Sequence, residues 1–108
     1  MADPIVNLIY TTVGSENEAA LIARTVVEEK LAACANIIPT IRSIYRWRDK
    51  IEDESESLIF IKTRSDAVDA LIARIKELHT YDVPDIVAIP IQKGHRPYID
   101  WIVANTRS

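Results

Sequence analysis

The predicted elements follow the order β-α-β-β-α-β with a short helix at the end, which indicates an α+β domain. Two observations predict such a domain. Segments rich in β-branched residues alternate with segments whose apolar residues recur at helical spacing, which gives the order of the elements. The length of 108 residues suffices for one hydrophobic core, which gives one domain. The order is that of the ferredoxin-like antiparallel sandwich, in which two helices cover one face of a four-stranded sheet. Residues 1–108 are therefore expected to form a single domain.

The first half of the chain predicts a strand, a helix and a second strand. Residues 4–12 are apolar and β-branched, which is typical of a mostly buried strand. Ser15 begins a capping-box pattern, and apolar residues at helical spacing predict a helix over 16–31. Residues 33–47 alternate as a strand does, and Pro39 within them requires a bulge or an edge position.

The second half predicts a helix, a strand and a terminal helix after the hairpin described below. Ser65 is expected to cap a helix over 65–79, whose apolar residues again recur at helical spacing. Residues 85–91 form an apolar strand pattern. Residues 96–106 look like a short helix with Pro97 in its first turn.

An extended, charged hairpin joins the two middle strands. A turn near Asp49 and Lys50 leads into a strand predicted over 54–63. Basic residues gather in the first arm and acidic residues in the second: Arg42, Arg46, Arg48 and Lys50, then Glu52, Asp53, Glu54 and Glu56. Opposite charges facing each other across such a pair stabilise it by roughly 0.2–1 kcal/mol per pair.

Two interpretations of this hairpin remain open. It is either a solvated, self-complementary arm or an arm that extends past the core and pairs with a neighbouring chain. Tyr45 and Trp47 favour the second interpretation, because they share one face and need a surface to bury against. A nucleic-acid site is not expected, since the adjacent acids cancel most of the field of the arginines.

The sheet is expected to need cover on both faces. The strand segments NLIYTT (7–12), LIFIKT (58–63) and IVAIPI (86–91) are apolar on both alternating sets of residues, and two helices cover only one side. The second face is therefore expected to meet another subunit, so we predict an oligomer.

Composition and motifs exclude several function classes. A net charge of −3 gives no general attraction to nucleic acids or anionic membranes, and no run of 18 apolar residues predicts a membrane span. No secretory signal is visible, so a cytoplasmic protein is expected. A Ser-His-Asp pattern, a P-loop and a Rossmann fingerprint are all missing from the sequence, so we expect no enzyme.

Two residues are candidate metal ligands, each beside a simpler interpretation. Cys34 lies between alanines and is either a small buried hydrophobe or a thiolate that a soft metal would select. His79 ends the second helix, where it caps carbonyls or joins Tyr81, Asp82 and Asp85 as a ligand. One cysteine and one histidine per chain do not complete a site, although a symmetric oligomer could assemble one.

Five motifs in order resemble the CutA family of divalent-cation tolerance proteins. They are EKLAACANIIP (29–39), SIYRWRDKIEDESE (43–56), IKT (61–63), HTYDVPDIVAIPI (79–91) and YIDWI (98–102). The resemblance implies a ferredoxin-like subunit in a homotrimer similar to the PII signalling proteins, with the long second and third strands extending between subunits. It also implies copper binding and a role in metal tolerance.

The resemblance carries specific residues over to this chain. It implies Cys34 and His79 as metal ligands in an intersubunit pocket. The residues that match the family's motifs around the intersubunit cleft are Tyr45, Trp47, Glu52, Glu56, Lys62, Tyr81 and Pro84. Some copper-binding members carry a cysteine and a second histidine where this chain has Tyr10 and Leu78.

The sequence thus predicts a homotrimeric protein that binds copper or another divalent cation, and not an enzyme. One alternative is a PII-like sensor in which Lys62 and nearby arginines bind a small anionic metabolite in the cleft. Another is a structural trimer that scaffolds a partner.

Overall fold

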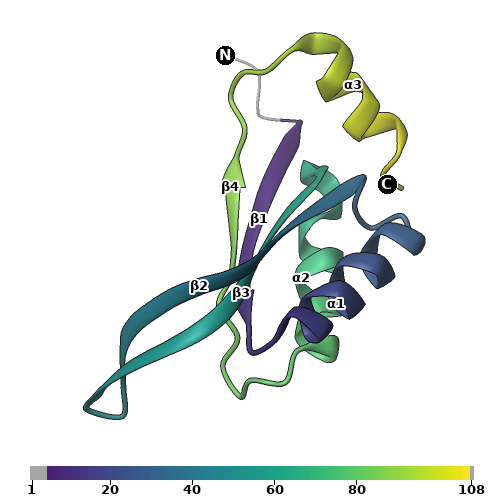
Figure 1. Cartoon of the computed structure of the whole chain (residues 1–108). Helices are drawn as coiled ribbons and strands as arrows, with labels where there is room; N and C mark the ends of the chain where they lie inside the picture. Colours follow the sequence, from purple (N-terminus) through teal and green to yellow (C-terminus); the bar gives the residue numbers. More distant parts are fainter. Residues whose placement is uncertain (1–4, 108) are drawn as a thin grey trace.

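The computed structural model describes residues 5–107 and confirms the ferredoxin-like order (Figure 1). The elements are β1 (Val6–Val13), α1 (Glu16–Glu28), β2 (Cys34–Trp47), β3 (Lys50–Arg64), α2 (Val68–Leu78), β4 (Ile86–Pro90) and α3 (Arg96–Ala104). All strand pairs are antiparallel, and the order across the sheet is β2-β3-β1-β4.

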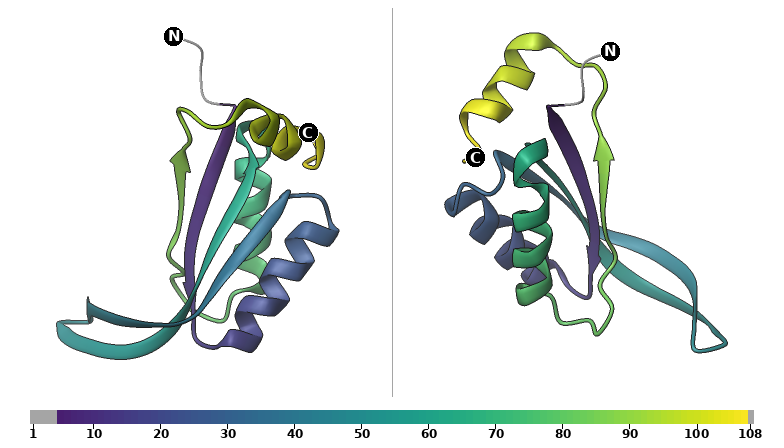
Figure 2. Two further views of the ribbon diagram at one scale, coloured as in Figure 1. Left: turned by 45° about the horizontal axis from the view of Figure 1, so that its top comes forward. Right: turned by 180° about the vertical axis from the view of Figure 1, so that it is seen from behind.

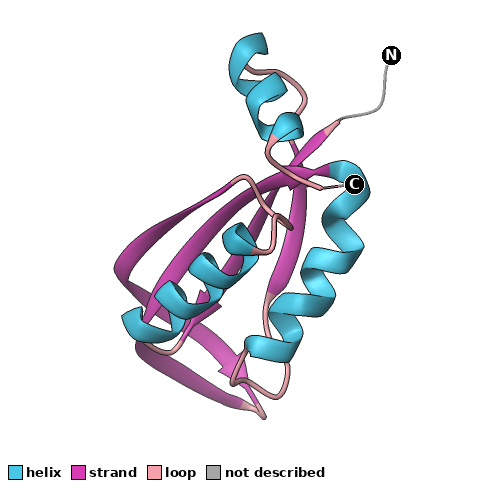
Figure 3. Cartoon of the chain, turned by 90° about the vertical axis from the view of Figure 1, so that its right-hand side faces the viewer, coloured by secondary structure: helices cyan, strands magenta, loops and turns pink. Residues whose placement is uncertain are grey.

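Helices α1 and α2 lie side by side on one face of the sheet (Figures 2 and 3). Alternate residues of the two central strands point toward them and are fully buried, as in Ile9 of β1 and Ile59 of β3. Apolar residues at helical spacing complete this core from the other side: Ile22 and Val26 of α1, and Leu71 and Ile75 of α2. The apolar residues at helical spacing and those at strand spacing thus pack together in one core.

Helix α1 begins as predicted but ends earlier than residue 31. The hydroxyl of Ser15 accepts a hydrogen bond from the Glu18 N–H at 3.2 Å, which caps the first turn. The helix ends at Glu28, because Lys30 adopts a left-handed conformation with φ of 60° and the Leu31 N–H turns back to the Val26 carbonyl. This conformation reverses the chain into β2.

The prediction that Ser65 caps the second helix is wrong. Ser65 begins a short 3-10 turn over Ser65–Ala67, and α2 follows it with Ala67 at its N-cap position. The Ser65 hydroxyl instead accepts a hydrogen bond from the Asn7 side chain at 2.6 Å. The hydroxyl that the capping pattern assigned to the helix therefore bonds a side chain of β1.

Both expectations for Pro39 are confirmed. Strand β2 is an edge strand, and its register with β3 shifts between Ile38 and Ile41. The Ser57 hydroxyl donates a hydrogen bond to the Pro39 carbonyl at 2.6 Å, which ties the bulge to β3. Bulges bend a strand, and the hairpin curls away from the sheet beyond this point (Figure 1).

The hairpin is longer than predicted, because β3 begins at Lys50 rather than at residue 54. Trp47 pairs with Lys50 across a two-residue turn in which Arg48 and Asp49 have φ of 50° and 66°. Two positive φ values in a two-residue loop match the twist of antiparallel strands. Residues 50–53 therefore pair with β2 instead of forming a loop.

The sheet face opposite α1 and α2 is apolar and largely uncovered. Tyr10 and Phe60 meet edge to face on it, with ring centroids 6.0 Å apart. Val87 is 50% exposed and Ile89 45% exposed on the same face. Helix α3 covers only one end, where Ile102 packs against Val6. We call this surface the open face, and its apolar residues are Leu8, Tyr10, Leu58, Phe60, Ile38, Val87 and Ile89.

Replacement of Ile59 by alanine should lower the free energy of unfolding by about 2–5 kcal/mol, because the side chain is fully buried between sheet and helices. Leu21→Ala on the exposed side of α1 is the control and should change it by less than about 0.5 kcal/mol. Urea unfolding at one protein concentration measures both. Equal losses in the two variants would contradict the described core.

Candidate functional site

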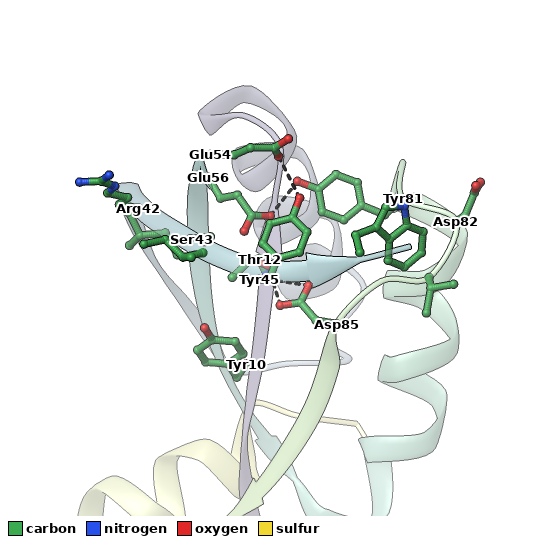
Figure 4. A pocket seen from close by; sticks show the side chains of 14 residues that line it. Tyr10, Thr12, Arg42, Ser43, Tyr45, Glu54, Glu56, Tyr81, Asp82 and Asp85 are labelled. Atoms are coloured by element: carbon green, nitrogen blue, oxygen red, sulfur yellow. Dashed lines mark hydrogen bonds between the residues drawn. The ribbon is translucent and has the colours of Figure 1, made fainter. Parts of the chain in front are cut away.

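A cavity of about 710 Å³ opens at the end of the open face, where the hairpin leaves the sheet (Figure 4). Three segments far apart in the chain form it: β1, the hairpin of β2 and β3, and the loop between α2 and β4. Its lining residues are Tyr10, Thr12, Ile41, Arg42, Ser43, Ile44, Tyr45, Trp47, Glu54, Glu56, Tyr81, Asp82, Val83 and Asp85. We call this cavity the hairpin cleft.

Two tyrosine–glutamate pairs lie in the hairpin cleft. The hydroxyl of Tyr45 donates to Glu54 at 3.0 Å, and that of Tyr81 donates to Glu56 at 2.7 Å (Figure 4). The hydrogen bond to Glu54 raises the pKa of Tyr45 to about 12. Burial, followed by the hydrogen bond to Glu56, raises the pKa of Tyr81 above its usual value. Both phenols therefore stay protonated at neutral pH and serve as donors to the carboxylates.

Asp85 fixes the loop between α2 and β4 to the sheet. Its carboxylate accepts hydrogen bonds from the Thr12 N–H at 3.3 Å and from the Thr12 hydroxyl at 2.5 Å. The loop therefore has a defined position on β1, and Tyr81 reaches Glu56 from it.

His79 is a support for the cleft wall and is only 9% exposed. Its Nε2 lies 2.8 Å from the Thr12 carbonyl oxygen, and its Nδ1 accepts a hydrogen bond from the Tyr81 N–H at 3.2 Å. Because a carbonyl oxygen only accepts, Nε2 carries the proton and Nδ1 does not. Both ring nitrogens are engaged inside the chain, so a metal ion bound to His79 must displace one of these partners.

Cys34 lies in a different cluster, beside α3. Its sulfur is 3.6 Å from the Tyr98 hydroxyl, which accepts a hydrogen bond from Lys62 Nζ at 3.1 Å. The same ammonium lies 5.3 Å from the centre of the Tyr98 ring. The hydrogen bond to Tyr98 raises the pKa of Lys62, and the nearby Cys34 adds a smaller contribution.

The two predicted metal ligands do not meet within one chain. Cys34 pairs with Lys62, which pairs with Leu8 on β1, whereas His79 binds Thr12 of the same strand. Leu8 and Thr12 are four residues apart on β1, which corresponds to about 13 Å along the strand. Within residues 5–107, no group of three or more histidine, cysteine, aspartate or glutamate side chains is arranged to hold a metal ion.

The predicted cleft residues divide between the hairpin cleft and the cluster around Cys34. Tyr45, Trp47, Glu56 and Tyr81 line the hairpin cleft. Glu52 lies outside its lining but pairs with Tyr45 across the hairpin, and Pro84 lies in the loop between Tyr81 and Asp85. Lys62 belongs to the Cys34 cluster.

Sequence reasoning missed Glu54 and Asp85 as cleft residues and Tyr98 as the partner of Cys34. Glu54 lies two residues before Glu56 on β3, so strand alternation alone could have placed both on one face. Tyr98 offered no local signal, since it approaches Cys34 from the other end of the sequence.

Comparison with known proteins decides the family. Residues 7–105 match the family model described as CutA1 divalent ion tolerance protein. The chain belongs to the CutA1 family.

Relatives of this CutA1 family member come from distant organisms. It is 48% identical over 99 residues to the divalent-cation tolerance protein CutA of Thermus thermophilus, covering 92% of this chain and 96% of that protein. It is 45% identical over 103 residues to mouse Protein CutA, covering 95% of this chain but only 58% of the mouse protein.

Solved CutA1 structures share the fold over nearly the whole chain. The divalent cation tolerance protein from Thermus thermophilus superposes with a TM-score of 0.92 at 46% identity, covering 95% of this chain and all of that one. CutA1 from a psychrotrophic Shewanella species gives a TM-score of 0.94 at 36% identity, covering 99% of this chain and all of that one. Among residues 5–107, no helix has the length and apolar character needed to span a membrane.

Two residues stand where some copper-binding CutA proteins were expected to have further ligands. Tyr10 lies on the open face and lines the hairpin cleft, and Leu78 packs against the core beneath the helices. Neither side chain supplies a nitrogen or thiolate donor. A nitrogen ligand from a side chain at this end of the sheet would therefore have to be His79.

The His79 ring is expected to be the neutral tautomer with the proton on Nε2 in the folded protein at about pH 7.5, because Nε2 faces a carbonyl oxygen. Long-range proton–nitrogen correlation spectra distinguish the two nitrogens directly, and exposed His95 gives an internal comparison. A proton on Nδ1 would contradict the assigned hydrogen bonds to Thr12 and Tyr81.

Proposed function

We propose that the protein is a homotrimeric divalent-cation binding and tolerance protein of the CutA type, with copper as the preferred metal. The observation that carries this proposal is the acidic hairpin cleft on the face of the sheet that the helices leave open. The family description as divalent ion tolerance proteins supports it independently.

Assembly into a trimer would cover the open face and could bring together site residues that lie far apart within one chain. The open face exposes large apolar side chains, and such a contiguous surface marks an interaction site. The hairpin extends beyond the sheet, where it can reach a neighbouring subunit (Figure 1). Contacts between subunits would also bring residues from opposite ends of two sheets together.

The metal site proposed here lies between subunits. Copper(II) favours nitrogen and oxygen donors, which His79 and the carboxylate of Glu56 supply. His79 would have to release the Tyr81 N–H from Nδ1 to present a lone pair. Cys34 would come from a neighbouring chain, since its own chain holds it at the far end of the sheet.

The electrostatics of the cleft favour a cation over the alternative anionic metabolite. Its lining includes four carboxylates and one guanidinium. Lys62, the residue proposed to bind an anion, lies outside the cleft and donates to Tyr98. An anion in the hairpin cleft would meet like charges, which is unfavourable.

The non-enzymatic role and the cytoplasmic location remain predictions. One relative is described as chloroplastic and one solved neighbour as periplasmic, so location varies among similar proteins.

Native mass spectrometry with one equivalent of Cu(II) per chain tests the proposal. The tag-free protein should gain discrete copper ions, and His79→Gln should lose most of this uptake. Glutamine can still donate to the Thr12 carbonyl, so the fold should persist. His95→Gln is the matched control, because it removes the other histidine from an exposed position.

Copper uptake that is unchanged in His79→Gln, or lost equally in His95→Gln, would contradict a site at the cleft wall. No discrete uptake by the wild-type protein would contradict the proposed copper function altogether.

A further inference from the structure

We infer that copies of the chain pack head to tail on the open face, with Lys62 of one chain forming an ion pair with Glu54 of the partner subunit. Head to tail means that the α3 end of one sheet meets the hairpin end of the next. The inference rests on the assembly in the proposed function, but it does not require copper binding. It treats the hairpin cleft as a contact surface that the neighbouring chain fills.

The two ends of the open face carry opposite charges. Side chains at alternate positions of β3 share one side of the strand, and on the side of the open face they are Glu54, Glu56, Leu58, Phe60 and Lys62. Two carboxylates thus lie at the hairpin end, two apolar side chains in the middle and an ammonium at the α3 end. The surface that needs cover is therefore apolar in its middle and bipolar at its ends.

Lys62 lacks a carboxylate partner within its own chain. Its ammonium donates to the Tyr98 hydroxyl at 3.1 Å and lies 5.3 Å from the centre of that ring, and a neutral phenol leaves the charge uncompensated. Arg64 and Arg96 at the same end each form an ion pair with an aspartate, at 2.8 and 2.9 Å, whereas Lys62 forms none within residues 5–107. An ammonium has three donors, so Lys62 can also bind a carboxylate.

The carboxylates of the hairpin cleft lack a cationic partner in the same way. Arg42, the one basic residue of the lining, donates two hydrogen bonds, at 2.8 and 2.7 Å, to Asp53, which lies outside the lining. Glu54 accepts from the Tyr45 hydroxyl at 3.0 Å, a donor that carries no charge. Glu54 is exposed, whereas Glu56 is almost fully buried, so a neighbouring chain reaches Glu54 first.

The two unpaired charges cannot meet within one chain. Glu54 and Lys62 are eight residues apart on β3, which corresponds to about 27 Å along the strand. A second copy on the open face removes water from both groups, which is unfavourable for a charge without a partner. Contact between like ends would place carboxylates opposite carboxylates, whereas head-to-tail contact gives each charge a partner. The two ends are also different patches of one chain, as a closed ring of three copies requires.

This packing also bears on the predicted metal ligands. The Tyr98 hydroxyl that binds Lys62 lies 3.6 Å from the sulfur of Cys34. An ion pair between Lys62 and Glu54 of the partner subunit therefore carries Cys34 toward the partner's cleft, whose wall His79 supports. Charge alone thus brings together the two residues that one chain holds apart.

Charge reversal tests the inference by sedimentation equilibrium of the full chain at a fixed urea concentration where the wild-type protein begins to dissociate. Lys62→Glu and Glu54→Lys each place like charges at every contact between copies. Each should raise the protein concentration of half-dissociation by at least about tenfold. The double variant Lys62→Glu/Glu54→Lys restores opposite charges and should return to within about threefold of the wild-type protein. Losses from two separate folding defects would add instead of cancelling.

A second double variant separates a specific ion pair from a change of net charge. Lys50 is an exposed lysine of the same strand but lies in the hairpin. Lys50→Glu/Glu54→Lys has the same net charge as the first double variant. We expect it to dissociate at least as readily as Glu54→Lys alone, because it leaves Lys62 facing a lysine.

A wild-type trimer whose Lys62→Glu/Glu54→Lys variant is no more stable than the single variants would overturn the inference and leave the proposed trimer standing. Equal recovery in the Lys50→Glu/Glu54→Lys variant would overturn it as well. A wild-type protein that sediments as single chains would reject both the trimer and this inference, while copper uptake decides the metal function separately.

Discussion

The structure depends on one constraint: its sheet has two apolar faces, and the chain has enough helix to cover only one of them. Helices α1 and α2 bury Ile9 and Ile59 on the covered face, while Phe60 and Val87 belong to the open face. Burial of apolar area contributes roughly 25 cal/mol per Å², so an uncovered sheet face is a strong drive for association. The hairpin cleft lies at the edge of that face, which is why its proposed ligands and the proposed assembly concern the same surface.

Much of the fold could be predicted from the sequence, because periodicity and turn chemistry are local. The element order, the Ser15 cap and the bulge at Pro39 each depend on a few neighbouring residues. Ser65 was misassigned because its hydroxyl bonds Asn7, whose distance in sequence no capping pattern reveals. The first residues of β3 were missed because their charges resemble a loop, although pairing with the basic arm of β2 holds them in the ladder.

The structure brings some of the predicted site residues together, and strand register explains why it separates others. Tyr45, Trp47, Glu56 and Tyr81 line one cavity, whereas their role in a cleft between subunits stays a prediction. Cys34 and His79 were both flagged by residue type, but residue type carries no information on position along the sheet. Their separation follows from the pairing of β1 with β3, which only the folded chain defines. The tautomer of His79 likewise depends on a carbonyl of β1 and could not be derived from its own segment.

Sedimentation equilibrium at micromolar concentration tests the central claim, that a second copy of the chain covers the open face. The account predicts a mass three times the 12.2 kDa of one chain. It also predicts that Val87→Glu, which places a charge on the open face, shifts the population toward single chains. A wild-type protein with the mass of one chain would contradict the account, because the apolar open face would then be stable in water without a partner.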